Sequence, residues 1–483
     1  MAQPILVKVL DVCRVAPLPN SAAPTSLPLT FYDLFWLRLR PSQRLFFYEF
    51  PVSKETFMDT ILPKLKNSLS VTLQHYLPLA GNLTWPLDSN KPVVQYNEGD
   101  AVSLTVGESD EDNFHHLSVN SFCEAQKYNG YVPYLLASKT RVPVIALQVT
   151  LFANAGFSIG YAAHHAVFDG KSLTMFLHSW ASICKRGGTG DSVLNLTPEL
   201  TPSYDRTIVN DPFDIEKAYL NGMMAHNGPN NRSLETWDSK VPSDVMLGTF
   251  QLTQANLECL KRRVKAKWQE QLIGKPSNFH PSTFAITIAY TWVCLVKSRK
   301  LTSEKVHLFM SVDCRARLEP PIPSTYFGNC ITACIIDVDT NKLMEEDGIA
   351  IAAWTIGEAI GRLGDGVLKG AKELIPKLLS IKKEGGLLTT IASSPRFEVY
   401  KIDFGWGRPK KMEIVSREKS GAISLSDSKD GNGGVEIGVA LNRHETEAFA
   451  SFFASGLEYR QGQESLESGG EIEFQEDGLR TCS

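Results

Sequence analysis

The stretch from Ile145 to Gly170 reads IALQVTLFANAGFSIGYAAHHAVFDG and decides how the surrounding chain folds. Apolar residues alternate on both sides of Asn154-Ala155-Gly156, which predicts two antiparallel strands joined by a turn. The second strand ends at His164 and His165, and residues 171–184 then have helical spacing. The stretch therefore predicts a β-hairpin, a short loop and a helix, with both histidines where the hairpin ends.

Regular patterns continue on both sides of this stretch. They predict helices over 53–76, 214–225, 254–268, 282–297, 348–363 and 445–457, and strands over 307–313, 330–338 and 435–441. Residues 185–244 are rich in Gly, Pro, Asn and Ser and show little periodicity, which indicates a domain boundary. We expect an N-terminal domain over 1–200, a crossover linker over 201–244, a C-terminal domain over 245–459 and a disordered tail over 460–483. Both domains mix strands with helices, which predicts an α/β protein with its active site between them.

The composition limits the partners and the compartment. The 483 residues include 49 Lys and Arg against 53 Asp and Glu, a net charge of −4, so no cationic surplus favours nucleic acid or a membrane. The nine cysteines are scattered through apolar segments, which is typical of reduced core residues, and they show no zinc-site spacing. No signal peptide or long apolar span is evident. We therefore expect a cytoplasmic, monomeric protein without a metal.

Three short motifs fit their surroundings poorly. Gly156-Phe157-Ser158-Ile159-Gly160 matches the nucleophile elbow of serine hydrolases, but a strand rather than a helix follows Ser158. A serine esterase that uses Ser158 stays open as an alternative. Asp403-Phe404-Gly405 lacks the accompanying kinase motifs. The segment from Asp427 to Gly433 lacks the acidic spacing of a calcium loop and predicts a turn between strands.

The pattern His165-x-x-x-Asp169 carries more chemistry. A neutral imidazole can take a proton from an alcohol near pH 7, and the end of a strand can place such a ring in a cleft. Taken alone the pattern is common, and a packed histidine followed by a helix-capping Asp169 would be the simpler explanation. Other segments of the chain favour the catalytic interpretation of His165 over the structural one.

Several segments together resemble one enzyme family. His165-x-x-x-Asp169-Gly170 and Asp403-Phe404-Gly405-Trp406-Gly407 look like the two signature motifs of the plant acyl-CoA-dependent BAHD acyltransferases. Further blocks resemble that family in its own order: Leu27 to Asp33, Pro78 to Asn82, Asp313-x-Arg315 and Tyr326 to Cys330. The block at 326–330 is similar to the anthocyanin and flavonoid glucoside branch, and residues 164–181 look like its malonyl-transferring members. The resemblance extends to about Leu457.

The resemblance implies a fold and a role for each motif residue. Family members have two chloramphenicol-acetyltransferase-like domains, with the substrate channel at their interface. His165 would be the general base, and Asp403 is a second catalytic candidate by its motif, although that motif is usually structural. Asp169 would pair with Arg315 and hold the loop geometry. Trp406 would support the fold.

Four further residues are candidates for substrate contacts. Ser393 and Ser394 stand where the family places polar groups near the developing oxyanion, although Ala392 replaces a common Thr. Trp36 resembles a channel-lining position, and a core tryptophan is the alternative. Lys171 is a candidate cation for a malonyl carboxylate, or else an exposed, solvated lysine.

The resemblance finally implies a reaction. The enzyme would hold no bound cofactor and would use acyl-CoA, with malonyl-CoA favoured, as its co-substrate. The acceptor would be a sugar hydroxyl of a flavonoid, anthocyanin or other phenolic glucoside, attacked directly and without an acyl-enzyme. Three alternatives stay open: a hydroxycinnamoyl-CoA donor, the serine esterase, and a binding protein that retains the fold without catalysis.

Overall fold

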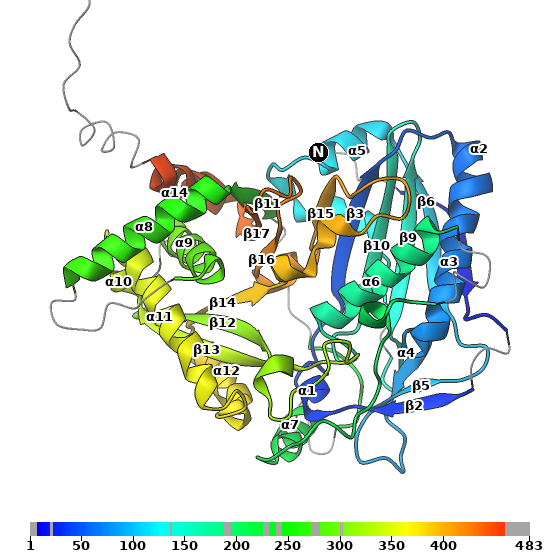
Figure 1. The fold of residues 1–483 in the computed structure, drawn as a ribbon, viewed down its shortest axis with the longest axis horizontal. Helices are drawn as coiled ribbons and strands as arrows, with labels where there is room; N and C mark the ends of the chain where they lie inside the picture. Colours follow the sequence, from blue (N-terminus) through cyan, green and yellow to red (C-terminus); the bar gives the residue numbers. More distant parts are fainter. Residues whose placement is uncertain are drawn as a thin grey trace, which may run out of the picture.

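The computed structural model describes residues 7–19, 23–135, 138–187, 195–225, 231–237, 244–271, 281–299, 301 and 303–458. Strands of these residues form three sheets, and helices cover the two larger ones (Figure 1). The tail over 460–483, predicted to be disordered, lies outside the described residues.

The first sheet contains the predicted hairpin. In spatial order its strands are β1 Lys8–Val15, β6 Val102–Ser109, β9 Ile145–Phe152, β10 Gly156–Ala163, β3 Ser42–Glu49 and β15 Lys411–Glu413. The hairpin is confirmed as the antiparallel pair of β9 and β10. Both strands are buried on both faces, although their alternating sequence is also typical of strands with one solvated face.

Two long helices cover one face of this sheet. The predicted helix over 53–76 is confirmed as a continuous run of α2 Lys54–Thr56, a π-helical turn Phe57–Ile61 and α3 Leu62–His75. The predicted helix after the histidines is α6 Gly170–Lys185. Trp180 on α6 is fully buried and donates from its indole N–H to the carbonyl of Leu65 on α3, at 3.2 Å. This contact joins the two helices over the sheet.

The second sheet comes mainly from the C-terminal half. Its spatial order is β13 Ile331–Asp339, β12 Lys305–Asp313, β14 Leu387–Ala392, β16 Ile423–Asp427, β17 Val435–Asn442, β11 Val245–Leu252 and β7 Cys123–Glu124. Its apolar face packs against α8 Gln254–Gln271, α9 Thr283–Ser298, α11 Gly348–Arg362 and α14 Thr446–Glu458 (Figure 1). These elements confirm the strands and helices predicted for residues 254–457, with ends that shift by a few residues.

The smaller elements complete the described chain. A third sheet has the order β2 Thr25–Pro28, β5 Val93–Tyr96, β4 Asn82–Thr84 and β8 Arg141–Pro143. The remaining α-helices are α1 Phe31–Leu34, α4 Leu77–Ala80, α5 Glu111–Leu117, α7 Ile215–Met224, α10 Thr340–Met344, α12 Leu374–Lys383 and α13 Arg417–Ser420. None of the described helices is both long enough and apolar enough to cross a bilayer.

Each large sheet takes one strand from the opposite half of the sequence. β15 pairs with β3 at the edge of the first sheet, and β7 pairs with β11 at the edge of the second. Lys411 of β15 adds a side-chain contact to this crossing, because its Nζ donates to the carbonyl groups of Leu117 and Val119 at 3.1 and 2.8 Å. A buried charge cluster holds this lysine. Glu413 lies between Lys411, with Nζ 3.6 Å from Oε2, and Arg417, and all three side chains are at most 2% exposed. Burial lowers the pKa of Lys411, and the Glu413 carboxylate opposes that shift.

We predict that Glu413→Ala lowers the free energy of unfolding by about 3–5 kcal/mol, because it leaves two buried cations without their counter-ion. Denaturant unfolding measures the effect. The matched control is Glu49→Ala, which removes the surface pair of Glu49 with Lys410 beside the same strands. This exposed pair should cost at most about 1 kcal/mol. Equal costs for the two variants would show that the buried cluster does not stabilise the crossing.

Candidate active site

His165 lies directly after the hairpin and before α6, at the boundary between the two halves. β10 ends at Ala163, and α6 begins at Gly170 with Asp169 as its N-cap. The half-buried imidazole stacks on Trp36, with ring centroids 4.2 Å apart and planes 15° from parallel. Trp36 is 7% exposed, so the tryptophan predicted to line the channel or to fill the core lies flat against the candidate base.

Burial keeps both histidines of the loop neutral near pH 7. It lowers the pKa of His165, while its own carbonyl group and the Asp169 carboxylate act in the opposite direction. Burial also lowers the pKa of His164 to about 4. The two rings differ in their surroundings, because His164 is fully buried and its Nδ1 accepts from the backbone N–H of Ala166 at 3.3 Å. His164 therefore belongs to the interior, and His165 is the ring that faces the boundary.

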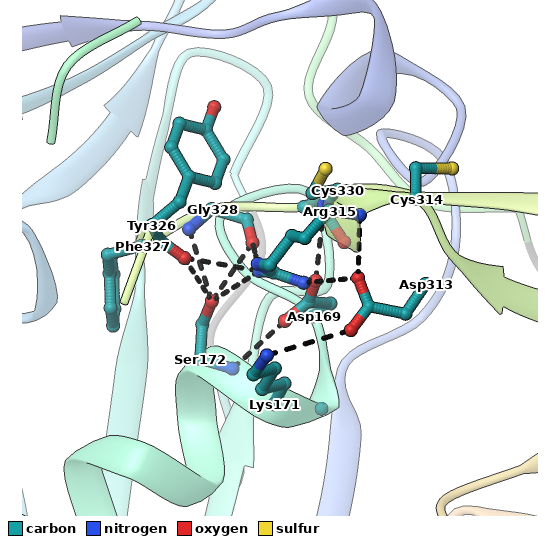
Figure 2. A network of polar contacts seen from close by, with 12 residues as sticks. Asp169, Lys171, Ser172, Asp313, Cys314, Arg315, Tyr326, Phe327, Gly328 and Cys330 are labelled. Carbon is teal, nitrogen blue, oxygen red and sulfur yellow. Dashed lines mark hydrogen bonds and ion pairs between the residues drawn. The ribbon is translucent and has the colours of Figure 1, made fainter. Parts of the chain in front are cut away.

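A buried ion pair fixes the loop between His165 and α6. Asp169 Oδ2 lies 2.8 Å from Arg315 Nη2, and both side chains are 2% exposed. The other carboxylate oxygen accepts the N–H of Ser172 at 2.9 Å, and Oδ2 also accepts the N–H of Cys330 at 3.1 Å. The carboxylate therefore caps α6 and binds the second half of the chain at the same time. Figure 2 shows Arg315 beside both Asp169 and Asp313.

The ion pair also shapes the charge of the guanidinium and the segment next to it. Burial alone would lower the pKa of Arg315, but Asp169 and Asp313 raise it, so the cation is retained. Several contacts of the same network meet at the hydroxyl of Ser172 (Figure 2). This hydroxyl donates to the carbonyl of Gly328 at 3.0 Å and accepts from Arg315 Nη2 at 3.3 Å. The start of α6 is thus fixed to the 326–330 block.

Asn329 is a site residue that we did not identify from the sequence. Its Nδ2 donates to the carbonyl oxygen of His165 at 2.8 Å and to Asp33 Oδ1 at 2.9 Å. Asp33 is fully buried, and its Oδ2 accepts from the backbone and the hydroxyl of Thr30. Both sequence blocks were recognised, but nothing in either one showed that they meet at the backbone of His165.

Asp403 and Trp406 lie at the other end of α6. Asp403 Oδ1 accepts the N–H groups of Gly405 and Gly407 at 2.8 and 3.0 Å, and Oδ2 lies 2.6 Å from Lys185 Nζ. Lys185 ends α6, which spans about 22 Å from its start next to the His165 loop. Trp406 packs edge-on against Phe157, with centroids 5.8 Å apart. The structure thus keeps Asp403 away from His165 instead of bringing the two catalytic candidates together.

The two serine candidates lie in a loop beside the site. Phe397 of this loop packs so closely on Gly170 that a Cβ there would lie 2.7 Å from the ring. Ser393 has φ of 66°, in the left-handed region that is strained for a residue other than glycine, and its hydroxyl accepts from Arg44 at 3.4 Å. The hydroxyl of Ser394 instead accepts the N–H of Arg396 at 3.3 Å. Ser394 is therefore committed to its own turn.

The remaining candidates from the sequence, Lys171 and Ser158, lie in a surface ion pair and in a buried strand. Lys171 Nζ lies 3.7 Å from Asp313 Oδ2, and its side chain is 38% exposed. Ser158 is fully buried in the middle of β10, between β9 and β3, and so it does not occupy the strand-to-helix turn of a nucleophile elbow. Within the described ranges, no group of three or more His, Cys, Asp or Glu side chains could hold a metal ion.

Comparison with known proteins agrees with this geometry. A sequence profile of the Transferase family matches residues 9–455. Phenolic glucoside malonyltransferase 1 of Arabidopsis thaliana is 39% identical over 466 residues, covering 93% of this chain and 98% of the relative. Malonyl-CoA:anthocyanidin 5-O-glucoside-6''-O-malonyltransferase of the same species is 40% identical over 462 residues, covering 94% and 98%. The crystal structure of vinorine synthase is similar, with a TM-score of 0.66 at 19% identity and coverage of 92% and 96%.

The fold and the site together define an acyl-CoA-dependent O-acyltransferase built from two chloramphenicol-acetyltransferase-like halves. The chain belongs to the Transferase family of BAHD acyltransferases. Both the fold class and the family predicted from the sequence are confirmed. Acyl-CoA is the co-substrate of the enzyme.

We predict that Asp169→Asn lowers both activity and thermal stability. The substitution leaves Arg315 buried without its main counter-ion, at a cost of about 3–5 kcal/mol. Calorimetry and initial rates measure the two effects. Asp313→Asn is the matched control, because Asp313 contacts the same guanidinium but is 45% exposed. An Asp169→Asn protein with full stability and lost activity would instead show that Asp169 polarises His165 directly.

Proposed function

We propose that this enzyme transfers a malonyl group from malonyl-CoA to a sugar hydroxyl of a phenolic glucoside, such as a flavonoid or anthocyanin glucoside. The observation that carries the mechanism is His165, a ring of lowered pKa at the boundary of the two halves, stacked on Trp36 and held by a buried ion pair. The donor and acceptor follow from the malonyltransferases acting on phenolic and anthocyanin glucosides, which are about 40% identical to this chain.

In this mechanism His165 is the general base. Its Nδ1 is buried and has no hydrogen-bond partner among the described residues, which leaves Nε2 as the ring nitrogen to meet the substrate. Nε2 takes the proton of the sugar hydroxyl while the hydroxyl oxygen attacks the thioester carbon. The tetrahedral intermediate then expels the CoA thiolate, which recovers that proton from the imidazolium. The products are the malonyl ester and free CoA.

The other site residues position the base and the acyl group. Asn329 binds the carbonyl oxygen of His165, and Asp169 holds the loop that follows. Trp36 limits rotation of the imidazole by stacking on one face. Both serine hydroxyls accept a hydrogen bond and keep their own hydrogen free to donate. We assign the oxyanion contact to Ser393, because the side chain of Ser394 is fixed as the cap of the turn that follows it. In this proposal Asp403 and Trp406 serve the fold.

The proposal includes a monomer that works in the cytoplasm. The cytoplasmic location is supported by the eight cysteines among the described residues, which are all free thiols and so suit a reducing compartment. Cell fractionation tests the compartment, and light scattering of the purified enzyme tests the oligomeric state.

Donor competition tests the proposed function. The enzyme receives malonyl-CoA and p-coumaroyl-CoA in equal amounts over an anthocyanidin 3-glucoside, and mass spectrometry identifies the ester. We expect the malonyl ester to dominate. A dominant p-coumaroyl ester would show that p-coumaroyl-CoA is the preferred donor, and it would leave the acyltransferase mechanism intact. Turnover that survives Ser158→Ala excludes the esterase.

We predict that His165→Ala reduces kcat about 10²- to 10⁴-fold while the protein remains folded, because it removes the general base. Steady-state rates and circular dichroism measure the two effects. His164→Ala is the control, since this neighbouring ring lies in the interior and should affect stability more than chemistry. Full activity in His165→Ala would show that another group is the base. Ligand binding without turnover in the wild type would favour the non-catalytic binding protein.

We predict a pH profile of kcat/KM that rises with pH and reaches its plateau by about pH 7.5, one unit above the ordinary histidine pKa. The base acts in its neutral form, and burial lowers the pKa of His165 below its ordinary value of about 6.5. The midpoint should therefore lie on the acid side of 6.5. A midpoint above pH 7.5 would be inconsistent with a buried neutral imidazole as the base.

A further inference from the structure

Arg44 differs from every other buried cation that the structure describes. The lysine and arginine side chains with at most 5% exposure in the described chain are Arg38, Arg44, Arg315, Arg417 and Lys411. Three of them face the carboxylates described above. Arg38 instead donates to four backbone carbonyl groups, those of Met223, Asn231, Ser233 and Glu235. The four cations other than Arg44 are therefore compensated within the protein.

Arg44 has no comparable partner among the described residues. It is 5% exposed, its Nε is buried without a hydrogen bond, and its Nη2 makes a long bond of 3.4 Å to the Ser393 hydroxyl. No described carboxylate forms an ion pair with it. Glu413 on the neighbouring strand β15 pairs with Leu45, the next residue of β3, and its carboxylate binds Arg417. Burying a guanidinium without a counter-ion is costly, so this site favours an anion from outside the chain.

The position of Arg44 connects it to the reacting groups. Arg44 lies opposite Tyr161 in the pairing of β3 with β10, and the same strand β10 leads into His165. From this position its guanidinium reaches across the boundary to Ser393, 349 residues further along the chain. Ser393 is the residue that the proposed mechanism places at the thioester oxygen. The cation therefore lies at the acyl end of the donor.

We propose that Arg44 binds the free carboxylate of the malonyl group and so selects a dicarboxylic acyl donor. This inference rests on the proposed malonyl transfer and names the residue that would recognise the donor. The carboxylate carbon of a malonyl thioester lies about 2.5 Å from the thioester carbon, across one methylene group. A guanidinium next to the group that binds the thioester oxygen is therefore at a suitable distance for the carboxylate. The two N–H groups along one edge of a guanidinium match the two carboxylate oxygens.

Lys171 is the weaker candidate for this role. It was the cation expected from the sequence, but it is 38% exposed and lies beside Asp313. A malonyl carboxylate would have to compete there with water and with a fixed carboxylate. Arg44 has neither competitor within the described structure, and its burial strengthens the attraction to an anion.

The test compares malonyl-CoA with acetyl-CoA, which lacks only the carboxylate, in wild-type enzyme and in Arg44→Gln. We expect kcat/KM for malonyl-CoA to fall about 10- to 100-fold, the usual effect of losing a charge-assisted contact. With acetyl-CoA the loss should be much smaller, so the donor ratio shifts toward acetyl. The melting temperature should not fall, because the substitution removes an uncompensated buried charge. Arg14→Gln, an exposed arginine on β1, is the control and should leave both donors unchanged.

Other outcomes overturn the inference. Equal losses with both donors would assign Arg44 to the CoA moiety or to the fold. An unchanged donor ratio in Arg44→Gln, in an enzyme whose wild type prefers malonyl-CoA, would refute Arg44 alone and leave the proposed function standing. A wild type that does not use malonyl-CoA would refute both. Should Arg44→Gln fail to fold, Arg44→Lys decides, because lysine keeps the charge but loses the paired N–H groups. Its malonyl-to-acetyl ratio should fall, and an unchanged ratio would overturn the inference.

Discussion

The buried pair of Asp169 and Arg315 is the interaction on which the rest of the site depends. Its carboxylate caps α6 in one half of the chain, and its guanidinium comes from the turn after β12 in the other half. Because both groups are shielded from water, neither can leave without exposing an uncompensated charge to an apolar interior. The loop that carries His165 is consequently held from both halves.

Burial serves opposite purposes for the charged and neutral groups of the site. It makes the Asp169 pair expensive to break, and it keeps the His165 ring in the neutral form that can accept a proton. Asn329 adds a neutral contact, since its side-chain amide binds the backbone carbonyl of His165. The Asn329 side chain also raises the pKa of His165, and in this it opposes the larger effect of burial.

The sequence predicted what depends on local pattern and on motif. The hairpin, the helix after it and the position of His165 between them follow from periodicity within some forty residues, and they agree with β9, β10 and α6. The contact of Asn329 with Asp33 joins positions 296 residues apart, and no periodicity encodes such a meeting. The separation of Asp403 from His165 depends on which end of α6 each motif contacts. The lack of a carboxylate partner for Arg44 is a property of three-dimensional packing, and it has no counterpart in the order of residues.

The exchanged strands β15 and β7 determine how the enzyme can move. Each half contributes an edge strand to the sheet of the other, so a hinge motion would have to break backbone hydrogen bonds on both sides. It would also break the hydrogen bonds from Lys411 Nζ to the carbonyl groups of Leu117 and Val119. A clamshell closure around substrate is therefore mechanically blocked. The separation of the two halves is therefore set by the fold itself, and adjustment to a substrate is left to side chains and loops. The same interlocking makes the chain a single folding unit, and neither half could be expressed alone with its sheet complete.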